Sequence, residues 1–278
     1  MKKYYIKDIQ NFKENNQRFA TITAYDYTSS LICNNLDFPL LLVGDSSSMV
    51  VFGYDDTTPI TMEEMLLLLR AVIRGNRSSL VVADMPFLSY QPSKRDAIHN
   101  AGQFIKAGAN AVKLEGGKEV LKAVDGLVKS GIPVMGHLGL LPQSINLMSG
   151  YKVQGKTKER ALELIEDAVL LQKAGAFSLV LEGVPAEVAK IITKKLKIPT
   201  VGIGSGPHCD GQIQVFHDVL GLFNKIVPKH TKKFTDGSRH LVDGLKKYKE
   251  SVESREFPGR ENYSALKPDV LKELSESI

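Results

Sequence analysis

Short apolar segments alternate along this chain with longer segments in which apolar residues recur at helical spacing. Most of the short segments are rich in Val, Ile and Leu, and their apolar residues are continuous rather than alternating with polar ones. Such runs predict strands that are buried on both faces, as in a parallel sheet covered by helices. The eight predicted strands cover residues 20–24, 39–43, 80–83, 111–114, 132–135, 177–181, 199–203 and 225–227.

The segments between these strands carry helix signals. Thr61 and Glu64 have the spacing of a capping box at the start of a helix over 61–74, and a second helix is predicted over 157–174. Eight strand and helix units favour a closed TIM-type (β/α)8 barrel of the α/β class over an open doubly wound sheet. A barrel of this type places its chemistry at the C-terminal ends of the strands.

The length and composition agree with one barrel domain spanning residues 1–278. The chain has 278 residues, of which 43% are hydrophobic, enough for a sizeable core. From about residue 231 the sequence becomes a charged helical extension, with helical segments at 241–253 and 266–275. We expect this extension to pack on the barrel or on a neighbouring subunit.

Four of the predicted strands end in a carboxylate. Asp45 follows LLLVG, Asp84 follows LVVA, Glu115 follows VKL, and Glu182 follows SLVL. Carboxylates at the ends of separate parallel strands can converge on one hard divalent cation. An all-oxygen set suits Mg²⁺, or Mn²⁺ as a substitute, better than zinc. A single Asp after a strand can equally serve as a helix N-cap, so Asp45 alone would leave both interpretations open.

Charge and cysteine content narrow the class of protein further. The formal charge is +5, and the basic residues are spread over predicted helices, so we expect a solvated surface and no nucleic-acid partner. Two cysteines, Cys33 and Cys209, are too few for a disulfide framework and indicate a reducing compartment. The first 20 residues lack the apolar core of a signal peptide, and no run reaches membrane-spanning length. We therefore expect a cytoplasmic protein without a membrane partner.

Six motifs occur in a fixed order at the predicted strand ends. They are TAYDYTSS (23–30), VGDSSSMVVFGYDDTTPIT (43–61), VVADMPFLSY (81–90), AGANAVKLEGG (107–117), PVMGHLGLLPQS (133–144) and VGIGSGPHCDGQIQVFHD (201–218). This order resembles the ketopantoate hydroxymethyltransferase family, also called 3-methyl-2-oxobutanoate hydroxymethyltransferases. The resemblance extends from the start of the chain to about Thr231.

The resemblance implies a defined reaction. A hydroxymethyl group would pass from 5,10-methylenetetrahydrofolate to 3-methyl-2-oxobutanoate, giving 2-dehydropantoate (ketopantoate) in pantothenate biosynthesis. The 2-oxo acid would bind the metal ion and react as a metal-stabilised enolate. The resemblance also implies a homo-oligomer, expected to be a decamer.

The carboxylates then take separate roles in that reaction. Asp45 and Asp84 are the expected metal ligands and help to bind the substrate, and Glu115 completes the metal site directly or through water. Glu182 is the candidate general base, because it ends its own strand and falls on the family's catalytic glutamate. His137 also ends a strand, and it is either a pocket residue or a structural histidine that orients a loop.

Two further residues are expected to bind the substrate. The resemblance implies that Ser46 hydrogen-bonds the substrate carboxylate and that Lys113 places a positive charge beside the oxygen where negative charge collects. Lys113 lies two residues before Glu115 in one predicted strand, so both side chains should share a face. A lysine inside a barrel is costly unless it is paired or functional.

The sequence departs from the family pattern at four positions near these motifs. Ser48 stands where the family has Gly, so the backbone there should avoid positive φ. Tyr54 replaces a common His, Gly183 a common Cys, and Ser205 an Ala. None of these residues is a proposed ligand or base.

Two other functions compete with this interpretation. One is a metal-dependent enolate enzyme of the phosphoenolpyruvate mutase and isocitrate lyase type, but the Lys-Lys-Cys-Gly-His loop typical of those enzymes is absent from the sequence. The other is a barrel without catalysis that serves in binding or assembly. The intact set of candidate site residues argues against the second alternative.

Overall fold

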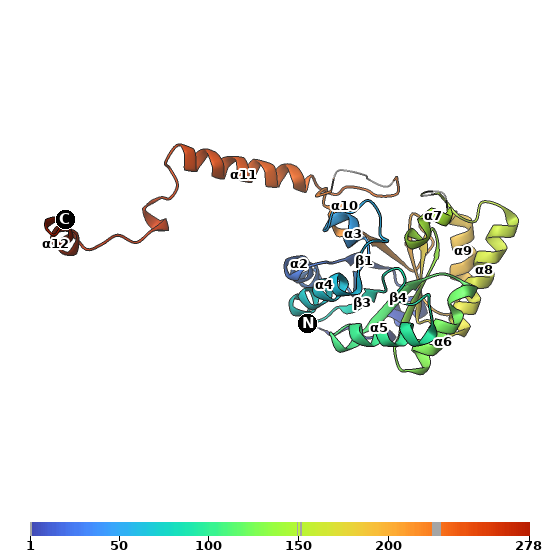
Figure 1. Cartoon of the computed structure of the whole chain (residues 1–278). Coiled ribbons are helices and arrows are strands. Elements are labelled where there is room, and N and C mark those ends of the chain that lie inside the picture. The colour runs from blue at the N-terminus through green and yellow to red at the C-terminus, as the bar shows by residue number, and fades with distance from the viewer. Residues whose placement is uncertain (1, 149, 151, 224–228) are drawn as a thin grey trace.

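The protein forms a closed barrel of eight parallel strands, β1 to β8, in sequence order (Figure 1). The computed structural model describes residues 2–148, 150, 152–223 and 229–278. This architecture confirms the predicted TIM-type (β/α)8 fold. The strands are β1 (Phe19–Thr23), β2 (Leu40–Val43), β3 (Leu80–Asp84), β4 (Ala111–Glu115), β5 (Val134–Gly139), β6 (Ser178–Glu182), β7 (Thr200–Ile203) and β8 (Gly211–Gln214).

The eighth strand is not the one predicted. β8 pairs with β7 on one side and with β1 on the other, and so closes the barrel. Its sequence, GQIQ, alternates between buried and solvent-facing positions, so the rule of continuous hydrophobicity overlooked it. The run 225–227, predicted as the eighth strand, lies outside the described residues.

Helices surround the barrel and connect its strands (Figure 1). The α-helices are α1 (Ile6–Glu14), α2 (Tyr27–Asn35), α3 (Ser47–Val50), α4 (Met62–Gly75), α5 (Lys94–Lys106), α6 (Leu121–Lys129), α7 (Ile145–Met148), α8 (Lys158–Lys173), α9 (Ala186–Lys195), α10 (Phe216–Val219), α11 (Gly237–Glu253) and α12 (Pro268–Glu276). Short 3₁₀ turns are η1 (Lys118–Val120), η2 (Pro142–Ser144) and η3 (Arg260–Asn262). In the described part of the chain, no helix combines the length and hydropathy that crossing a bilayer requires.

The predicted capping box is present. Thr61 accepts a hydrogen bond from the amide of Glu64, and the Glu64 carboxylate accepts one from the amide of Thr61, at the start of α4. Thr157 caps α8 with a single bond, which its side chain accepts from the amide of Arg160. Both helices therefore begin where the sequence predicted.

Alternating strand residues build two separate apolar layers. Leu80 and Val82 of β3 face the barrel interior, which Ile9 of α1 helps to fill, whereas Val81 and Ala83 pack in the layer between strands and helices. The same alternation in β4 turns Ala111 inward. The same alternation of side chains between the two faces of each strand continues into the polar residues at the strand ends, and it decides which of them point into the barrel.

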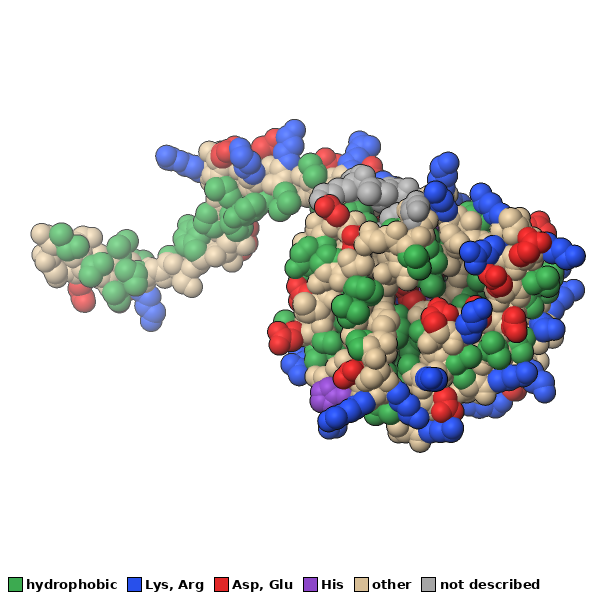
Figure 2. Space-filling model, turned by 45° about the vertical axis from the view of Figure 1, so that its right-hand side comes forward, with side chains coloured by type: hydrophobic (Ala, Val, Ile, Leu, Met, Phe, Trp, Pro, Cys, Tyr) green, Lys and Arg blue, Asp and Glu red, His purple; other side chains and the backbone are tan. Residues whose placement is uncertain are grey.

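The C-terminal extension contacts the barrel domain of its own chain through its first residues, where the amides of Phe234 and Gly237 donate to the backbone oxygens of Val219 and Leu220. α11 and α12 project away from the barrel (Figure 1), and neither helix contains a buried residue. Packing of these two helices on a neighbouring subunit stays a prediction. The exposed apolar side chains of α11 recur at helical spacing and form one stripe: Leu241, Leu245, Tyr248 and Val252. Figure 2 shows apolar side chains along one side of α11 and charged ones on the other.

The end of β5 depends on a glycine. Gly139 has a φ of +103°, and a Cβ there would lie 2.1 Å from the backbone oxygen of Glu182. Gly131 also has positive φ, at +79°, but a Cβ there would meet no heavy atom of the described residues within 4 Å. The two positions share backbone strain and differ in steric clash.

We predict that Gly139→Ala destabilises the protein far more than Gly131→Ala. The left-handed backbone costs an alanine roughly 1–2 kcal/mol at either site, and the clash at Gly139 adds about 1–3 kcal/mol of overpacking. Urea unfolding of both variants measures the difference in free energy of unfolding. Equal losses at the two positions would contradict the proposed contact between the end of β5 and Glu182.

Candidate active site

The polar residues at the strand ends point into the C-terminal end of the barrel. In β3 and β4 the alternation that turns Val82 and Ala111 inward does the same for Asp84, Lys113 and Glu115. The strand register places Asp84 beside Lys113 and Glu115 beside His137. The barrel therefore brings together the residues that the sequence predicted to converge.

Lys113 and Asp84 form a buried ion pair. Lys113 Nζ lies 2.7 Å from Asp84 Oδ1 and 2.8 Å from Oδ2, and 3.8 Å from Glu115 Oε1. Burial alone lowers the pKa of Lys113, but the carboxylates of Asp84 and Glu115 outweigh it and raise that pKa above its usual range. Lys113 is thus a fixed cation, and the predicted shared face of Lys113 and Glu115 is confirmed.

Asp45 lies two residues beyond β2, next to this pair. Its backbone N–H donates to Asp84 Oδ2 at 3.3 Å, and its own Oδ2 accepts from Gln143 Nε2 at 2.8 Å. Burial and the nearby charge of Asp84 raise the pKa of Asp45 well above its ordinary value. A proton or a cation at this position would relieve the repulsion between the two carboxylates.

His137 connects the remaining two carboxylates. Its Nδ1 lies 3.3 Å from Glu115 Oε1, and its Nε2 lies 3.3 Å from Glu182 Oε2. Burial and the charge of Lys113 lower the pKa of His137, but contacts with the two carboxylates outweigh them and raise it to about 9. Of the two roles left open for His137, the structure supports the pocket position.

The composition of this cluster fits a divalent cation. Among the described residues, Lys113 and His137 are the basic side chains within 4 Å of the carboxylates of Asp84, Glu115 and Glu182, and none lies that close to Asp45. The described residues also leave three buried atoms, Glu115 Oε1 and both ring nitrogens of His137, without a well-aligned hydrogen-bond partner. Within the described ranges, no three His, Cys, Asp or Glu side chains form a ready metal site. Mg²⁺ commonly takes one or two carboxylates and keeps several waters, so a pair such as Asp45 and Asp84 would fit it without a third protein ligand.

Ser46 and Glu182 lie at the more open side of the cluster. Ser46 Oγ is 2.8 Å from the hydroxyl of Tyr25, which fixes its position at the start of α3. The side chain of Glu182 is 15% exposed, whereas those of Asp84 and Glu115 are 2% exposed. A substrate entering from the strand ends meets Glu182 first among these carboxylates.

Sequence reasoning overlooked three polar residues that contact the site. Gln143 reaches Asp45 from the loop after β5, Tyr90 bonds the backbone of Glu115 at 3.1 Å, and Tyr25 contacts Ser46. Each lies in one of the quoted strand-end motifs, which is the only signal that marks them. Their side chains project from loops, whose course no hydrophobic period predicts.

The departures from the family pattern are accommodated locally. Ser48 lies in α3, so the expected avoidance of positive φ is confirmed, and its hydroxyl donates to the backbone oxygen of Asp56 at 2.6 Å. Ser205 is buried, donates to the oxygen of Leu181 at 2.8 Å and accepts from the amide of Val184 at 3.1 Å. Its hydroxyl thus bonds the backbone on both sides of Glu182, at Leu181 and at Val184.

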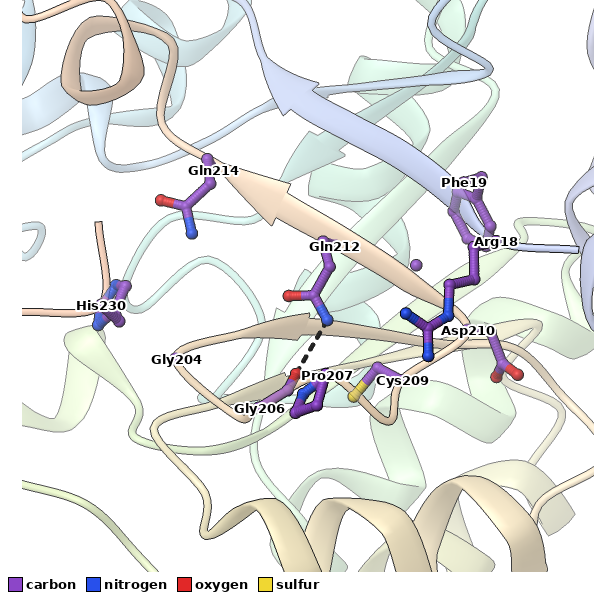
Figure 3. A pocket seen from close by; sticks show the side chains of 11 residues that line it. Arg18, Phe19, Gly204, Gly206, Pro207, Cys209, Asp210, Gln212, Gln214 and His230 are labelled. Carbon is purple, nitrogen blue, oxygen red and sulfur yellow. Dashed lines mark hydrogen bonds between the residues drawn. The ribbon is translucent and has the colours of Figure 1, made fainter. Parts of the chain in front are cut away.

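A pocket of about 520 Å³ lies along β8, and one of its lining residues, His230, is near enough to Glu182 to feel its charge. Figure 3 shows Gln212 and Gln214 of β8 beside it, with Arg18 toward one end and His230 toward the other. The solvent-facing side of β8 lines this pocket, because the connection from β7 to β8 contains no helix to cover it. The perturbed acidic and basic groups lie in the buried cluster, which is therefore the candidate active site.

We predict that Lys113→Met lowers the free energy of unfolding by about 3–5 kcal/mol, because it leaves the buried Asp84 carboxylate uncompensated. The matched control is Lys129→Met, which removes an exposed pair with Asp125 at 2.8 Å and should cost less than about 1 kcal/mol. Denaturant unfolding measures both. A Lys113 variant as stable as the control would show that the pair does not balance the charge of the barrel interior.

The sequence of this chain is similar to that of known proteins of one family. A sequence model described as "Ketopantoate hydroxymethyltransferase" matches residues 3–260. The chain is 50% identical over 270 residues to a 3-methyl-2-oxobutanoate hydroxymethyltransferase from Carboxydothermus hydrogenoformans, covering 97% of this chain and 98% of that protein. It is 49% identical over 273 residues to the protein of the same name from Nitrosopumilus maritimus, covering 98% of both.

Solved structures share the fold at low sequence identity. Phosphonopyruvate hydrolase, crystallised in complex with oxalate and Mg²⁺, has a TM-score of 0.60 at 13% identity and covers 100% of this chain and 96% of that one. A 2,3-dimethylmalate lyase of the phosphoenolpyruvate mutase and isocitrate lyase superfamily has a TM-score of 0.58 at 17% identity, covering 98% and 96%. The competing enolate enzymes thus share the architecture, but sequence decides the family. The chain belongs to the ketopantoate hydroxymethyltransferase family and is a transferase.

Proposed function

We propose that this protein transfers a hydroxymethyl group from 5,10-methylenetetrahydrofolate to 3-methyl-2-oxobutanoate, giving 2-dehydropantoate for pantothenate biosynthesis. The observation that carries the proposal is the buried cluster of Asp45, Asp84, Lys113, Glu115 and Glu182 at the C-terminal end of the barrel. It occurs in a chain about half identical to proteins named for this reaction.

The metal site in this proposal uses Asp45 and Asp84. These carboxylates would hold Mg²⁺, or Mn²⁺ in its place, while Glu115 acts through water. When bound, the cation supplies Lewis-acid stabilisation of the negative charge on the substrate's keto oxygen. The excess of buried negative charge supports this assignment.

Ser46 and Lys113 bind the 2-oxo acid in this scheme. The Ser46 hydroxyl, held by Tyr25, donates to the substrate carboxylate. The ammonium of Lys113 is held by Asp84 and Glu115 and cannot swing away. It therefore offers a fixed positive charge to the oxygen that becomes negative when C3 loses its proton.

Glu182 removes the C3 proton in this scheme. Its carboxylate is the most exposed of the acidic groups in the cluster, and His137 holds one of its oxygens from the interior side. The proton moves from C3 to a Glu182 carboxylate oxygen. Both C–N bonds of the donor's methylene carbon break and water supplies its oxygen, so that tetrahydrofolate leaves and the carbon reacts at the oxidation level of formaldehyde. The enolate carbon forms the new C–C bond with this carbon, and the resulting alkoxide takes up a proton to become the hydroxyl group. Positioned bases of this kind contribute about 10²–10⁴ in rate.

We further propose that the protein acts in the cytoplasm as a homo-oligomer, expected to be a decamer, without a nucleic-acid or membrane partner. Both cysteines are buried and free, which suits a reducing compartment. The apolar stripe on α11 has no partner within the chain's barrel, which favours contact with another copy.

We predict that purified protein forms 2-dehydropantoate from the two substrates only when a divalent cation is present. Excess EDTA should abolish formation, and added Mg²⁺ or Mn²⁺ should restore it. The product is measured by mass spectrometry. Full turnover by a preparation shown to be metal-free would overturn the metal assignment, and no product at all with Mg²⁺ would overturn the proposed reaction.

We predict that Glu182→Gln lowers both deuterium exchange at C3 and hydroxymethyl transfer by about 10²–10⁴. Metal-dependent binding of 3-methyl-2-oxobutanoate should remain, because the amide keeps the shape and leaves Asp45 and Asp84 untouched. The matched control is Glu187→Gln, an exposed residue on the following helix α9. Loss of transfer with normal exchange would instead assign Glu182 to positioning the folate.

We predict that Leu245→Glu, in the middle of the apolar stripe of α11, reduces the size of the assembly. Lys247→Glu, which lies off that stripe, should leave it unchanged. Light scattering during size-exclusion chromatography gives the mass of each variant. A monomeric wild type, or equal masses for both variants, would contradict assembly through the apolar stripe of α11.

A further inference from the structure

Gln143 is a buried polar residue that reaches the carboxylate cluster from a loop. It lies in η2, between β5 and α7, and is 3% exposed. Its Nε2 donates to Asp45 Oδ2 at 2.8 Å and to the backbone oxygen of Met85 at 2.9 Å, and its backbone N–H donates to Glu115 Oε2 at 3.1 Å. One neutral residue thus directs hydrogen-bond donors at two carboxylates that come from different strands.

The orientation of the Gln143 amide is set by its neighbours. Both protons of Nε2 face acceptors, while Oε1 faces the hydroxyl of Tyr90 at 3.0 Å. A flipped amide would turn Oε1 toward the acceptors of Asp45 and Met85, which is unfavourable in a buried site. Tyr90 itself is held by the backbone of Glu115 at 3.1 Å, so Tyr90 and Gln143 form one connected network.

A neutral donor has a specific advantage at this position. A lysine here would neutralise Asp45 and compete with a cation, whereas an amide orients the carboxylate and leaves its charge available. Residues that hydrogen-bond to metal-ligating carboxylates fix their orientation and tune their affinity. Gln143 also ties this orientation to the loop after β5, because its side chain reaches Asp45 only while η2 stays docked on the barrel end.

We propose that Gln143 is a positioning residue for the cation site: it holds the carboxylates of Asp45 and Glu115 in their binding orientation, with Tyr90 fixing its amide. The proposal rests on the proposed function, in which Asp45 and Asp84 hold the cation. It adds a requirement that the loop after β5 be docked before the site is complete.

The test measures binding of Mn²⁺ to the purified full-length protein by calorimetry and by electron paramagnetic resonance, without turnover. Gln143→Met keeps the length of the side chain and removes its donors, and should weaken Mn²⁺ binding about 10- to 100-fold. Tyr90→Phe leaves the amide in place without its hydroxyl partner and should weaken binding by a smaller factor. Gln172→Met is the matched control, because the side chain of Gln172, on α8, accepts from the amides of Lys197 and Ile198 and, among the described residues, bonds neither Gln143 nor Tyr90 nor the carboxylates.

The outcomes separate this inference from the proposed function. A wild type that binds no Mn²⁺ would overturn the metal site itself. A wild type that binds Mn²⁺, together with folded Gln143→Met and Tyr90→Phe variants of unchanged affinity and unchanged resonance spectrum, would overturn the positioning role alone. If Gln143→Met does not fold, Tyr90→Phe decides: weaker binding at a normal melting temperature supports the proposal, and unchanged binding refutes it.

Discussion

The ion pair between Lys113 and Asp84 sets the charge balance on which the rest of the active-site end depends. Four carboxylates project into a barrel end that is almost closed to solvent, where an uncompensated charge is very costly. Lys113 compensates Asp84, and His137 lies between Glu115 and Glu182. The remaining repulsion falls on Asp45, whose pKa is raised well above its ordinary value by burial and by the charge of Asp84.

The carboxylates near the Lys113–Asp84 pair differ in position from Glu182, and so suit a different role. Asp45 and Asp84 are deep and adjacent to a fixed ammonium, an arrangement suited to holding a cation and a bound anion. Glu182 lies nearer the opening and is joined to the interior only through His137. A base in this position can take a proton from a substrate without being a ligand of the cation.

Most of the site was predictable because strand periodicity governs it. Side chains along a strand alternate between its two faces, and this alternation alone places Lys113 and Glu115 on the same face. Asp84 and Glu182 lie near them because all strands of a parallel barrel end at the same rim. Gln143 and Tyr90 were missed because they come from loops, where side-chain direction depends on turn geometry and on partners distant in sequence. Motif membership marked their neighbourhood but not their contacts.

Two features of the fold were missed for a common physical reason. Two expectations assume that every apolar face is buried within one chain: that strands read as continuous apolar runs, and, as the first of the two alternatives for the C-terminal extension, that it packs on its own barrel. β8 breaks the first assumption, because its outward positions are Gln212 and Gln214 and the β7–β8 connection contains no helix to cover them. α11 breaks the second, because it presents Leu241, Leu245 and Tyr248 to solvent. β8 turns Gln212 and Gln214 to the outside of the barrel, and α11 projects away from the barrel, so in both places the partner that buries a side chain need not belong to the same chain. The interior follows the strand period closely, because its partners are all supplied by the barrel itself.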